Sequence, residues 1–396
     1  MRIVHLTDYF QPSLGYQETF LAKQQKLNGH EVLVVTSDRY APFPNYKSTV
    51  EPILGQRFLK PGRFLEEGIE VVRMKTSFEI SNRAFFSGVN FLLSSIRPDV
   101  VHAHNVMKFT TLSAVLAKRR LGCCLVVDDH QHPIDVRQDI FGQWFYRCFR
   151  MLASNFFAGR VDKFVGVTTE ITESMSTLYG IKKCKLETVE LGVDVEQFRF
   201  CDESRKEVRN SLGISEEAFL VIYTGKVIEE KGIHILYEAI SKLGGKVVGM
   251  IVGNATNDYE SFLSEKAVAL GIESNIKRVK AVTQRELPRY FSAADVACWP
   301  KGVSISTLEA ASCGLPLVIA KGTVASRVSE GNGFEYELGN IEDLLSKLKS
   351  FVESPERTKL FGQRSRKMVL NNYSWPKINS KFMQIYQSCL QDRKNF

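Results

Sequence analysis

The strongest constraint on the fold is an alternation, repeated twice along the chain, of short β-branched runs with longer segments of helical spacing. The first series of predicted strands lies at 2–7, 31–36, 100–104, 124–128 and 164–168. The second series lies at 219–224, 246–252, 276–279, 296–299 and 317–319. Short apolar strands separated by helices are typical of parallel sheets that are covered on both faces. The sequence therefore predicts an α/β protein with two doubly wound, Rossmann-like domains.

The length of the chain agrees with two domains. With 396 residues, 44% of them hydrophobic, the chain is too long for one ordinary core and fits two domains of roughly 200 residues each. The polar stretch at 201–207 interrupts the rhythm of strands, so we expect domains at 1–200 and 201–374. Ligands of such sheets bind at the carboxyl ends of the strands, and two facing domains therefore predict a site in an interdomain cleft.

Composition excludes several classes of protein. No apolar run reaches the ~18 residues that span a bilayer, and the N-terminal residues read as a strand rather than a signal peptide, so a cytoplasmic location is expected. The eight cysteines form no Cys-x-x-Cys pair and suggest neither a zinc site nor a disulfide framework. The net charge of +8 fits an anionic partner. Nucleic acid is not expected, because the chain has no long Lys/Arg tract.

The segment 298–319 reads as a strand end, a loop of small residues, the start of a helix and a second buried strand. If the helix begins near Ser304 to Ser306, the backbone amides of Ile305, Ser306 and Thr307 face the loop. Free amides at the N-terminus of a helix bind anions, and phosphate is the anion that we expect here. Glu309 follows one turn into the helix. The same residues also fit a capping box in which Ser306 and Glu309 bond each other's backbone amides, and in isolation this is the simpler interpretation.

The segment resembles the nucleotide-sugar site of retaining glycosyltransferases of family 4, whose usual pattern is Glu, any seven residues, and Glu. Glu309 occupies the second position, and Lys301 occupies the first. The resemblance covers nearly the whole chain, from an N-terminal signature that contains Gly15 to Leu-Gly-Val-Asp at 191–194. It implies a GT-B fold, with two facing Rossmann-like domains, an interdomain cleft, and a final helix at about 375–396 that packs back on the N-terminal domain.

The resemblance also implies roles for individual residues. Lys226 and Lys231 carry the donor diphosphate, with Lys226 in place of the usual Arg. Glu309 holds the ribose hydroxyls, and the amides of 305–307 assist the lysines. Lys301 either contacts the donor sugar or turns to solvent. Gly15 lets the backbone approach a phosphate, although it also fits a simple turn, and the lysines also fit an exposed loop.

Histidines follow two predicted strands. His130 falls where the family places a His against the donor sugar, and we prefer it to His102, His104 or His132. The close His pairs also fit a metal site, but two successive carboxylates, Asp128 and Asp129, would face opposite sides of a strand. We therefore expect no metal and no cofactor, because lysines and a helix dipole can neutralise the leaving diphosphate.

These observations predict a glycosyltransferase that moves a sugar with retention from a UDP- or GDP-sugar to a glycan, lipid-linked or small-molecule acceptor. The aromatic and basic stretch 141–160 has helical spacing that fits a core helix, with a membrane-surface helix as the alternative. It leaves open a peripheral association with the inner face of the cell membrane. Two other functions remain: a sugar-nucleotide epimerase of the same fold, and a non-catalytic sugar-nucleotide-binding subunit, suggested by Lys301 in place of the first Glu.

Overall fold

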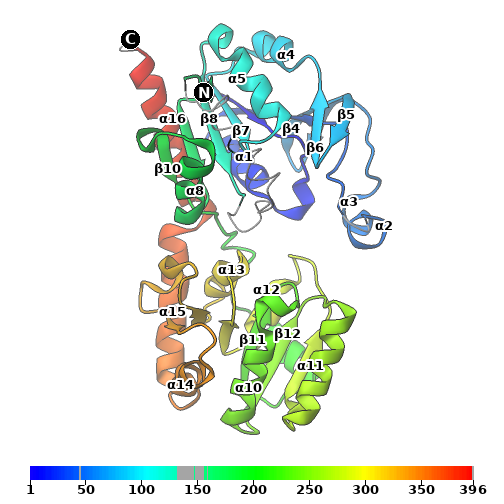
Figure 1. The fold of residues 1–396 in the computed structure, drawn as a ribbon, viewed down its shortest axis with the longest axis vertical. Helices are drawn as coiled ribbons and strands as arrows, with labels where there is room; N and C mark the ends of the chain where they lie inside the picture. The colour runs from blue at the N-terminus through cyan, green and yellow to red at the C-terminus, as the bar shows by residue number, and fades with distance from the viewer. Residues whose placement is uncertain (44–45, 132–146, 148–155, 158, 395–396) are drawn as a thin grey trace. The chain divides into compact units, whose positions relative to one another are not determined.

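The structure is a computed structural model that describes residues 1–43, 46–131, 147, 156–157 and 159–394. The stretch 141–160 and His132 therefore lie largely or wholly outside the described residues. The chain divides into two compact units, which are described one at a time (Figure 1). Unit 1 comprises Met1–Gly192 and Trp375–Phe396, and unit 2 comprises Val193–Ser374.

Unit 1 contains an eight-stranded sheet in the order β10-β9-β8-β7-β1-β2-β4-β3, in which only the β3–β4 pair is antiparallel. Its strands are β1 Arg2–Leu6, β2 Glu31–Ser37, β3 Gly62–Glu66, β4 Ile69–Met74, β7 Val100–His104, β8 Cys124–Asp129, β9 Lys163–Gly166 and β10 Leu186–Thr188. A separate hairpin is formed by β5 Thr76–Ile80 and β6 Arg83–Phe86. The helices among its described residues are α1 Gln17–Leu27, α2 Tyr46–Thr49, α3 Glu51–Leu54, α4 Val89–Ile96, α5 Phe109–Leu121, α8 Thr169–Tyr179 and α16 Trp375–Lys394.

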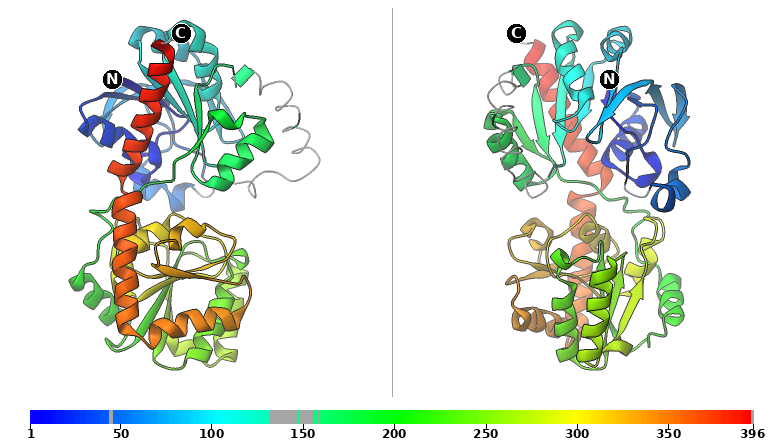
Figure 2. Two further views of the ribbon diagram at one scale, coloured as in Figure 1. Left: turned by 90° about the vertical axis from the view of Figure 1, so that its left-hand side faces the viewer. Right: turned by 45° about the vertical axis from the view of Figure 1, so that its right-hand side comes forward.

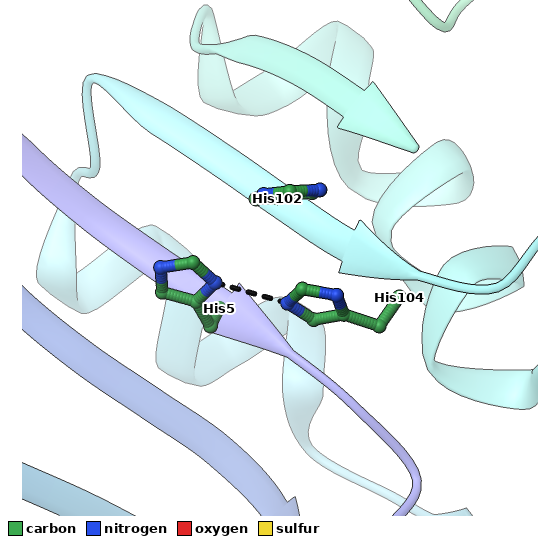
Figure 3. A group of neighbouring side chains, drawn as sticks. All are labelled: His5, His102 and His104. Carbon is green, nitrogen blue, oxygen red and sulfur yellow. Dashed lines mark hydrogen bonds between the residues drawn. The ribbon is translucent and has the colours of Figure 1, made fainter. Parts of the chain in front are cut away.

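Alternate residues of the central strands in unit 1 face two different layers of helices. Val4, Val101 and Val127 belong to the core that includes residues of α4, α5 and α8. Residues on the other face pack against α1 and α16, which is red in Figure 2. Trp375 at the start of α16 stacks on Phe20 of α1, with ring centroids 4.9 Å apart. This second face also carries three buried histidines (Figure 3).

Unit 2 contains a parallel six-stranded sheet in the order β13-β12-β11-β14-β15-β16. Its strands are β11 Phe219–Thr224, β12 Val247–Val252, β13 Ile276–Val279, β14 Val296–Trp299, β15 Leu317–Ala320 and β16 Gly333–Tyr336. Its helices are α9 Asp202–Ser211, α10 Ile233–Leu243, α11 Asn257–Ala269, α12 Leu287–Ala293, α13 Ser306–Ser312, α14 Ile341–Val352 and α15 Pro355–Asn372. The prediction of an α/β protein with parallel sheets is confirmed.

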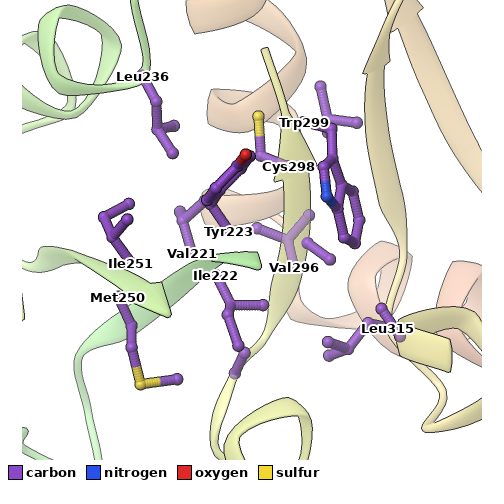
Figure 4. Packing of buried hydrophobic residues seen from close by; sticks show 14 of the residues in the cluster. Val221, Ile222, Tyr223, Leu236, Met250, Ile251, Val296, Cys298, Trp299 and Leu315 are labelled. Carbon is purple, nitrogen blue, oxygen red and sulfur yellow. The ribbon is translucent and has the colours of Figure 1, made fainter. Parts of the chain in front are cut away.

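The core of unit 2 explains why two strand ends meet. Tyr223 of β11 and Trp299 of β14 are fully buried in one apolar cluster (Figure 4). The indole Nε1 of Trp299 donates a 3.0 Å hydrogen bond to the carbonyl of Thr224, which ties the end of β14 to the end of β11. From β11 the chain adds β12 and β13 on one side of the sheet, and it then adds β14, β15 and β16 on the other side. The direction in which strands are added therefore changes between β11 and β14. Such a switch point is where open parallel sheets bind ligands.

Candidate functional site

A cavity of about 310 Å³ lies at the carboxyl ends of β11 and β12 in unit 2. Its walls come from the ends of the two strands, from the loop before α12 and from the first residue of α13. The lining residues are Thr224, Gly225, Lys226, Val252, Gly253, Asn254, Ala281, Val282, Leu287 and Ser306. The volume is at the lower end of the range of small-molecule sites, and its walls mix apolar side chains with backbone polar groups, as such sites usually do.

Two glycines allow the strand ends to approach each other closely. Gly225 and Gly253 have φ angles of +138° and +151°. A Cβ atom placed on Gly253 would lie 1.8 Å from the carbonyl oxygen of Gly225, so no side chain fits there without moving the backbone. The two loops therefore form a floor of backbone atoms against which a flat ligand can pack.

Glu309 is a buried carboxyl on α13 with a side-chain partner far away in the sequence. Its residue is 4% exposed, and its Oε1 accepts a 3.0 Å hydrogen bond from Nε2 of Gln284. Burial raises the pKa of Glu309 to about 7, although the bond from Gln284 and the charge of Arg327 act in the opposite direction. A buried carboxyl poised near neutral pH is typical of a functional rather than a structural position.

The capping-box interpretation of the same residues is wrong. Helix α13 begins at Ser306, its N-cap is Ile305, and no side chain caps it. The hydroxyl of Ser306 instead bonds the hydroxyl of Ser304 at 2.6 Å, and the amide of Glu309 donates to the carbonyl of Ile305. The carboxyl of Glu309 is therefore not used to close the helix end.

The start of α13 offers two backbone amides rather than three. The amide of Thr307 donates to the carbonyl of Ser304 at 3.2 Å, so it is already engaged. The amides of Ile305 and Ser306 have no acceptor within the described part of the chain. Of the three amides predicted to face a ligand, those of Ile305 and Ser306 therefore remain available as hydrogen-bond donors.

Three lysines follow the strands of unit 2 that meet at the switch point. Lys226 follows β11, Lys231 ends a 3₁₀ turn before α10, and Lys301 follows β14. Lys231 and Lys301 pack side by side. The side chain of each lysine reaches the glycine that follows the other lysine. A Cβ on Gly232, next to Lys231, would lie 3.1 Å from Cγ of Lys301, and a Cβ on Gly302, next to Lys301, would lie 3.3 Å from Nζ of Lys231.

None of these three ammonium groups forms an ion pair with a described carboxylate. This distinguishes them from lysines elsewhere in unit 2, such as Lys242, which bonds Glu342. Uncompensated positive charge at strand ends attracts an anion, and a polyphosphate presents several acceptor oxygens to such a group.

Sequence reasoning missed Gln284 and Arg327. Arg327 lies in the 3₁₀ turn Ala325–Val328 and is 4% exposed. Its guanidinium donates to the carbonyl of Ser304 at 2.5 Å and to the hydroxyl of Thr307, so it braces the loop before α13. Neither residue stands in a recognisable motif, and only the packing of unit 2 brings them to Glu309.

The two remaining predicted residues, Gly15 and His130, belong to unit 1. Gly15 has a φ of +71° and ends the 3₁₀ turn Pro12–Leu14, a left-handed conformation that suits the turn predicted for it. His130 follows β8, is 30% exposed, and lines a cavity of about 230 Å³ together with Tyr16 and Glu18. Burial lowers the pKa of His130, but the nearby Asp128 carboxylate more than offsets this and the pKa is raised.

Two α/β units built on largely parallel sheets are the architecture of the GT-B class of glycosyltransferases, and the lysines and the buried carboxyl of unit 2 lie at its strand ends. Comparison with models of known protein families supports this assignment. Residues 19–197 match the model of Glycosyltransferase Family 4, and residues 204–368 match the model of Glycosyl transferases group 1. The chain belongs to this family of glycosyltransferases.

Several curated relatives match part of the chain. A D-inositol 3-phosphate glycosyltransferase 2 from Catenulispora acidiphila is 24% identical over 258 residues, which are 61% of this chain and 60% of that protein. Spore coat protein SA of Bacillus subtilis is 23% identical over 57% of this chain and 65% of its own. The matched region thus spans about 60% of the length of these relatives.

Solved structures show the same fold at low identity. The crystal structure of Anabaena Alr3699/HepE in complex with UDP has a TM-score of 0.73 at 19% identity, covering 98% of this chain and all of that one. A glycosyltransferase from Rickettsia africae has a TM-score of 0.73 at 16% identity, with 98% of each chain covered. Among the described residues, no helix has the length and apolar character needed to cross a bilayer.

Proposed function

We propose that the protein transfers a sugar from a nucleoside diphosphate sugar, with UDP or GDP as the nucleotide, to a hydroxyl acceptor with retention of configuration. The observation that carries the proposal is the arrangement around the cavity of unit 2. Lys226 and Ser306 line this cavity, and Lys231 and Lys301 follow the ends of the neighbouring strands. The buried carboxyl of Glu309, one turn further along α13, is held in place by Gln284. A nucleotide sugar presents both partners that this site lacks, namely phosphate oxygens and ribose hydroxyls.

Each group then has a chemical role. Lys226 and Lys231 neutralise the negative charge that develops on the leaving diphosphate, which is the largest contribution such a site can make to rate. Glu309 accepts hydrogen bonds from the ribose hydroxyls, and a charged acceptor makes these stronger than neutral bonds. His130 contacts the donor sugar. Because the lysines supply the positive charge, this step requires no divalent ion.

The acceptor is proposed more broadly, as a glycan, a lipid-linked glycan or a small hydroxyl compound. The relative from Mycolicibacterium smegmatis, 25% identical over 48% of this chain, carries the name GDP-mannose-dependent alpha-(1-6)-phosphatidylinositol monomannoside mannosyltransferase. Unit 1 exposes aromatic side chains, including Phe58, which lies under the guanidinium groups of Arg39 and Arg57. Both guanidinium groups also pair with Glu79, so the exposed aromatic ring, rather than a net positive charge, supports a peripheral association with a membrane surface.

A panel of nucleotide sugars tests the proposal. A donor at 100 times its dissociation constant should raise the free energy of unfolding by about 2.7 kcal/mol, which is measured as thermal stabilisation. Products formed with added acceptors should keep the anomeric configuration of the donor, as read by NMR. Inversion would contradict retention, conversion of the donor without acceptor would indicate an epimerase, and stabilisation without turnover would indicate a binding subunit.

Replacing Lys301 by Glu is expected to change which donor sugar is preferred. A Lys can only donate hydrogen bonds, and with no carboxylate partner among the described residues it favours a sugar that bears a carboxylate or another strong acceptor. Lys301→Glu should move the ratio of kcat/KM between uronic and neutral donors by about 10- to 100-fold towards neutral hexoses, the range of one charge-assisted hydrogen bond. Lys359→Glu, on the exposed face of α15, is the matched control. An unchanged ratio would show that Lys301 does not read the sugar.

A further inference from the structure

A row of buried polar side chains crosses one face of the sheet in unit 1. His5 of β1 is in register with His102 of β7, and His104 of β7 is in register with Asp128 of β8. Residues in register on parallel strands point to the same side, so the four side chains lie on the face of the sheet that packs against α1 and α16. Figure 3 shows the three histidines. All four are at most 2% exposed. Imidazoles and carboxylates are seldom buried to this extent unless they are paired or bind a ligand.

A chain of hydrogen bonds links two of the histidines to acceptors at both ends. Nε2 of His5 lies 2.8 Å from Oε1 of Gln25, and Nδ1 of His5 lies 2.9 Å from Nε2 of His104. Nδ1 of His104 lies 2.7 Å from Oδ2 of Asp128. Three such bonds need three protons, whereas two neutral imidazoles carry two. The network therefore has room for one additional positive charge beside Asp128.

A metal ion can supply that charge and leave the rest of the network intact. With a cation on Nδ1 of His104, the opposite nitrogen donates to His5, and His5 donates to Gln25. Both rings are then neutral, the bonds from His104 to His5 and from His5 to Gln25 are kept, and the cation replaces the hydrogen bond between His104 and Asp128. Metal-bound histidines usually donate their second ring proton to such a fixed acceptor, which orients the ligand. Asp128 is also held, because its Oδ1 accepts from the amide of Asn105 at 3.0 Å.

We propose that His104, Asp128 and His130 bind one divalent cation of the zinc type. The ligand atoms of all three residues lie within 4.8 Å of one another, and Nε2 of His130 is 3.6 Å from Oδ2 of Asp128. Two imidazoles and one carboxylate form a ligand set that suits Zn²⁺ and leaves a fourth position open. His104 and His130 both line the 230 Å³ cavity of unit 1, which provides entry for the ion and space for water or for Glu18.

The alternative trio is less suitable. His5, His102 and His104 satisfy the same distance limit but are completely buried, and His5 and His102 already bond Gln25 and the hydroxyl of Tyr386. The sequence argument against a metal was that Asp128 and Asp129 face opposite ways. They do so: Asp129 accepts from the hydroxyl of Tyr179 at 3.0 Å. A three-ligand site needs only one carboxylate, so this argument does not exclude the ion.

Binding of the cation has a consequence that rests on the proposed function. The ion would occupy Nε2 of His130 and so remove this imidazole from the donor sugar. The cation is therefore an inhibitor of sugar transfer and not a cofactor, and it acts independently of the lysines of unit 2.

Binding of Zn²⁺ alone to the full chain tests the site without any sugar. Isothermal titration and equilibrium dialysis of chelator-treated protein should give one ion per chain. His130→Asn, which changes a partly exposed side chain, should weaken binding at least about tenfold, the lower limit seen when groups around a metal site are removed. His30→Asn, a histidine outside the cluster, should bind as the unchanged protein does. Substoichiometric binding, or normal affinity in His130→Asn, would overturn the proposal.

A second measurement separates the site from the activity. If the chain transfers sugar, added Zn²⁺ should lower the rate, and EDTA should restore it. A rate that rises with Zn²⁺ would overturn the inhibitory role. Failure to detect any transfer would count against the proposed function alone, because the binding experiment contains no donor.

Discussion

Glu309→Gln is expected to weaken binding of the nucleotide donor by about 10- to 100-fold and to lower activity at least as much, because a neutral amide loses the charge-assisted bonds to the ribose hydroxyls. The fold should remain intact. Gln keeps an oxygen that can accept the bond from Gln284, and no cap of α13 is lost, since the carboxyl does not cap the helix. Calorimetry with UDP and GDP, together with initial rates, measures both effects.

The same substitution should make the protein more stable at neutral and alkaline pH. An unfolded chain ionises this carboxyl near its usual value of 4.5, whereas burial raises the pKa in the folded protein to about 7. Stability is therefore lost as pH rises between these two values, because only the unfolded state releases the proton. The loss amounts to roughly 3 kcal/mol at most, since one pKa unit corresponds to about 1.4 kcal/mol.

The neutral amide introduced by Glu309→Gln would carry no such penalty, so the variant and the unchanged protein should unfold alike near pH 4 and diverge above about pH 5. Denaturant unfolding across that range measures the difference. Glu265→Gln, on the exposed side of α11, is the matched control and should show no divergence. A variant that is less stable than the unchanged protein at every pH, with normal donor binding, would mean that Glu309 serves the fold rather than the ligand.

Local patterns account for what the sequence predicted well. Strands β11, β12 and β14 are continuous apolar runs because both faces of their sheet are covered, so each is visible without its neighbours. Strands β3 to β6 were not predicted. β3 and β5 carry mostly exposed side chains, and β4 is only half buried, so no apolar run marks them. β3 and β4 pair at the edge of the large sheet, and β5 and β6 pair with each other in a hairpin. These pairings depend on residues that lie on neighbouring strands and not on a local apolar pattern.

The site shows the same division between local and distant information. Residues 301–309 stand on one loop and one helix start, so the resemblance to a family motif was enough to select them as candidates from the sequence. Gln284 and Arg327 lie 25 and 20 residues from their partners Glu309 and Thr307, and only folding of unit 2 brings them together. The prediction of a capping box was wrong for a related reason. The sequence contains the local pattern, but in the folded unit the carboxyl of Glu309 is buried and bonds Gln284 instead of the helix end.

Lys226→Ala and Lys231→Ala are each expected to lower kcat by about 100-fold, the loss typical when one preorganised charge-stabilising group is removed from a transition state. Lys226 is exposed and Lys231 is only partly buried, so neither change should reduce stability measurably. Lys359→Ala, on the exposed face of α15, controls for loss of surface charge. Single-turnover rates at saturating donor separate this effect from weaker binding.

Lys226→Arg provides a sharper distinction. An Arg presents a planar fork that can bond two phosphate oxygens, whereas a Lys acts as a point charge. If Lys226 contacts the diphosphate, the Arg variant should retain most of the activity that the Ala variant loses. Treatment with EDTA should not lower turnover in the unchanged protein. A strict requirement for a divalent ion would contradict neutralisation by lysine, because a metal bound to the diphosphate would already supply the charge that these side chains are proposed to provide.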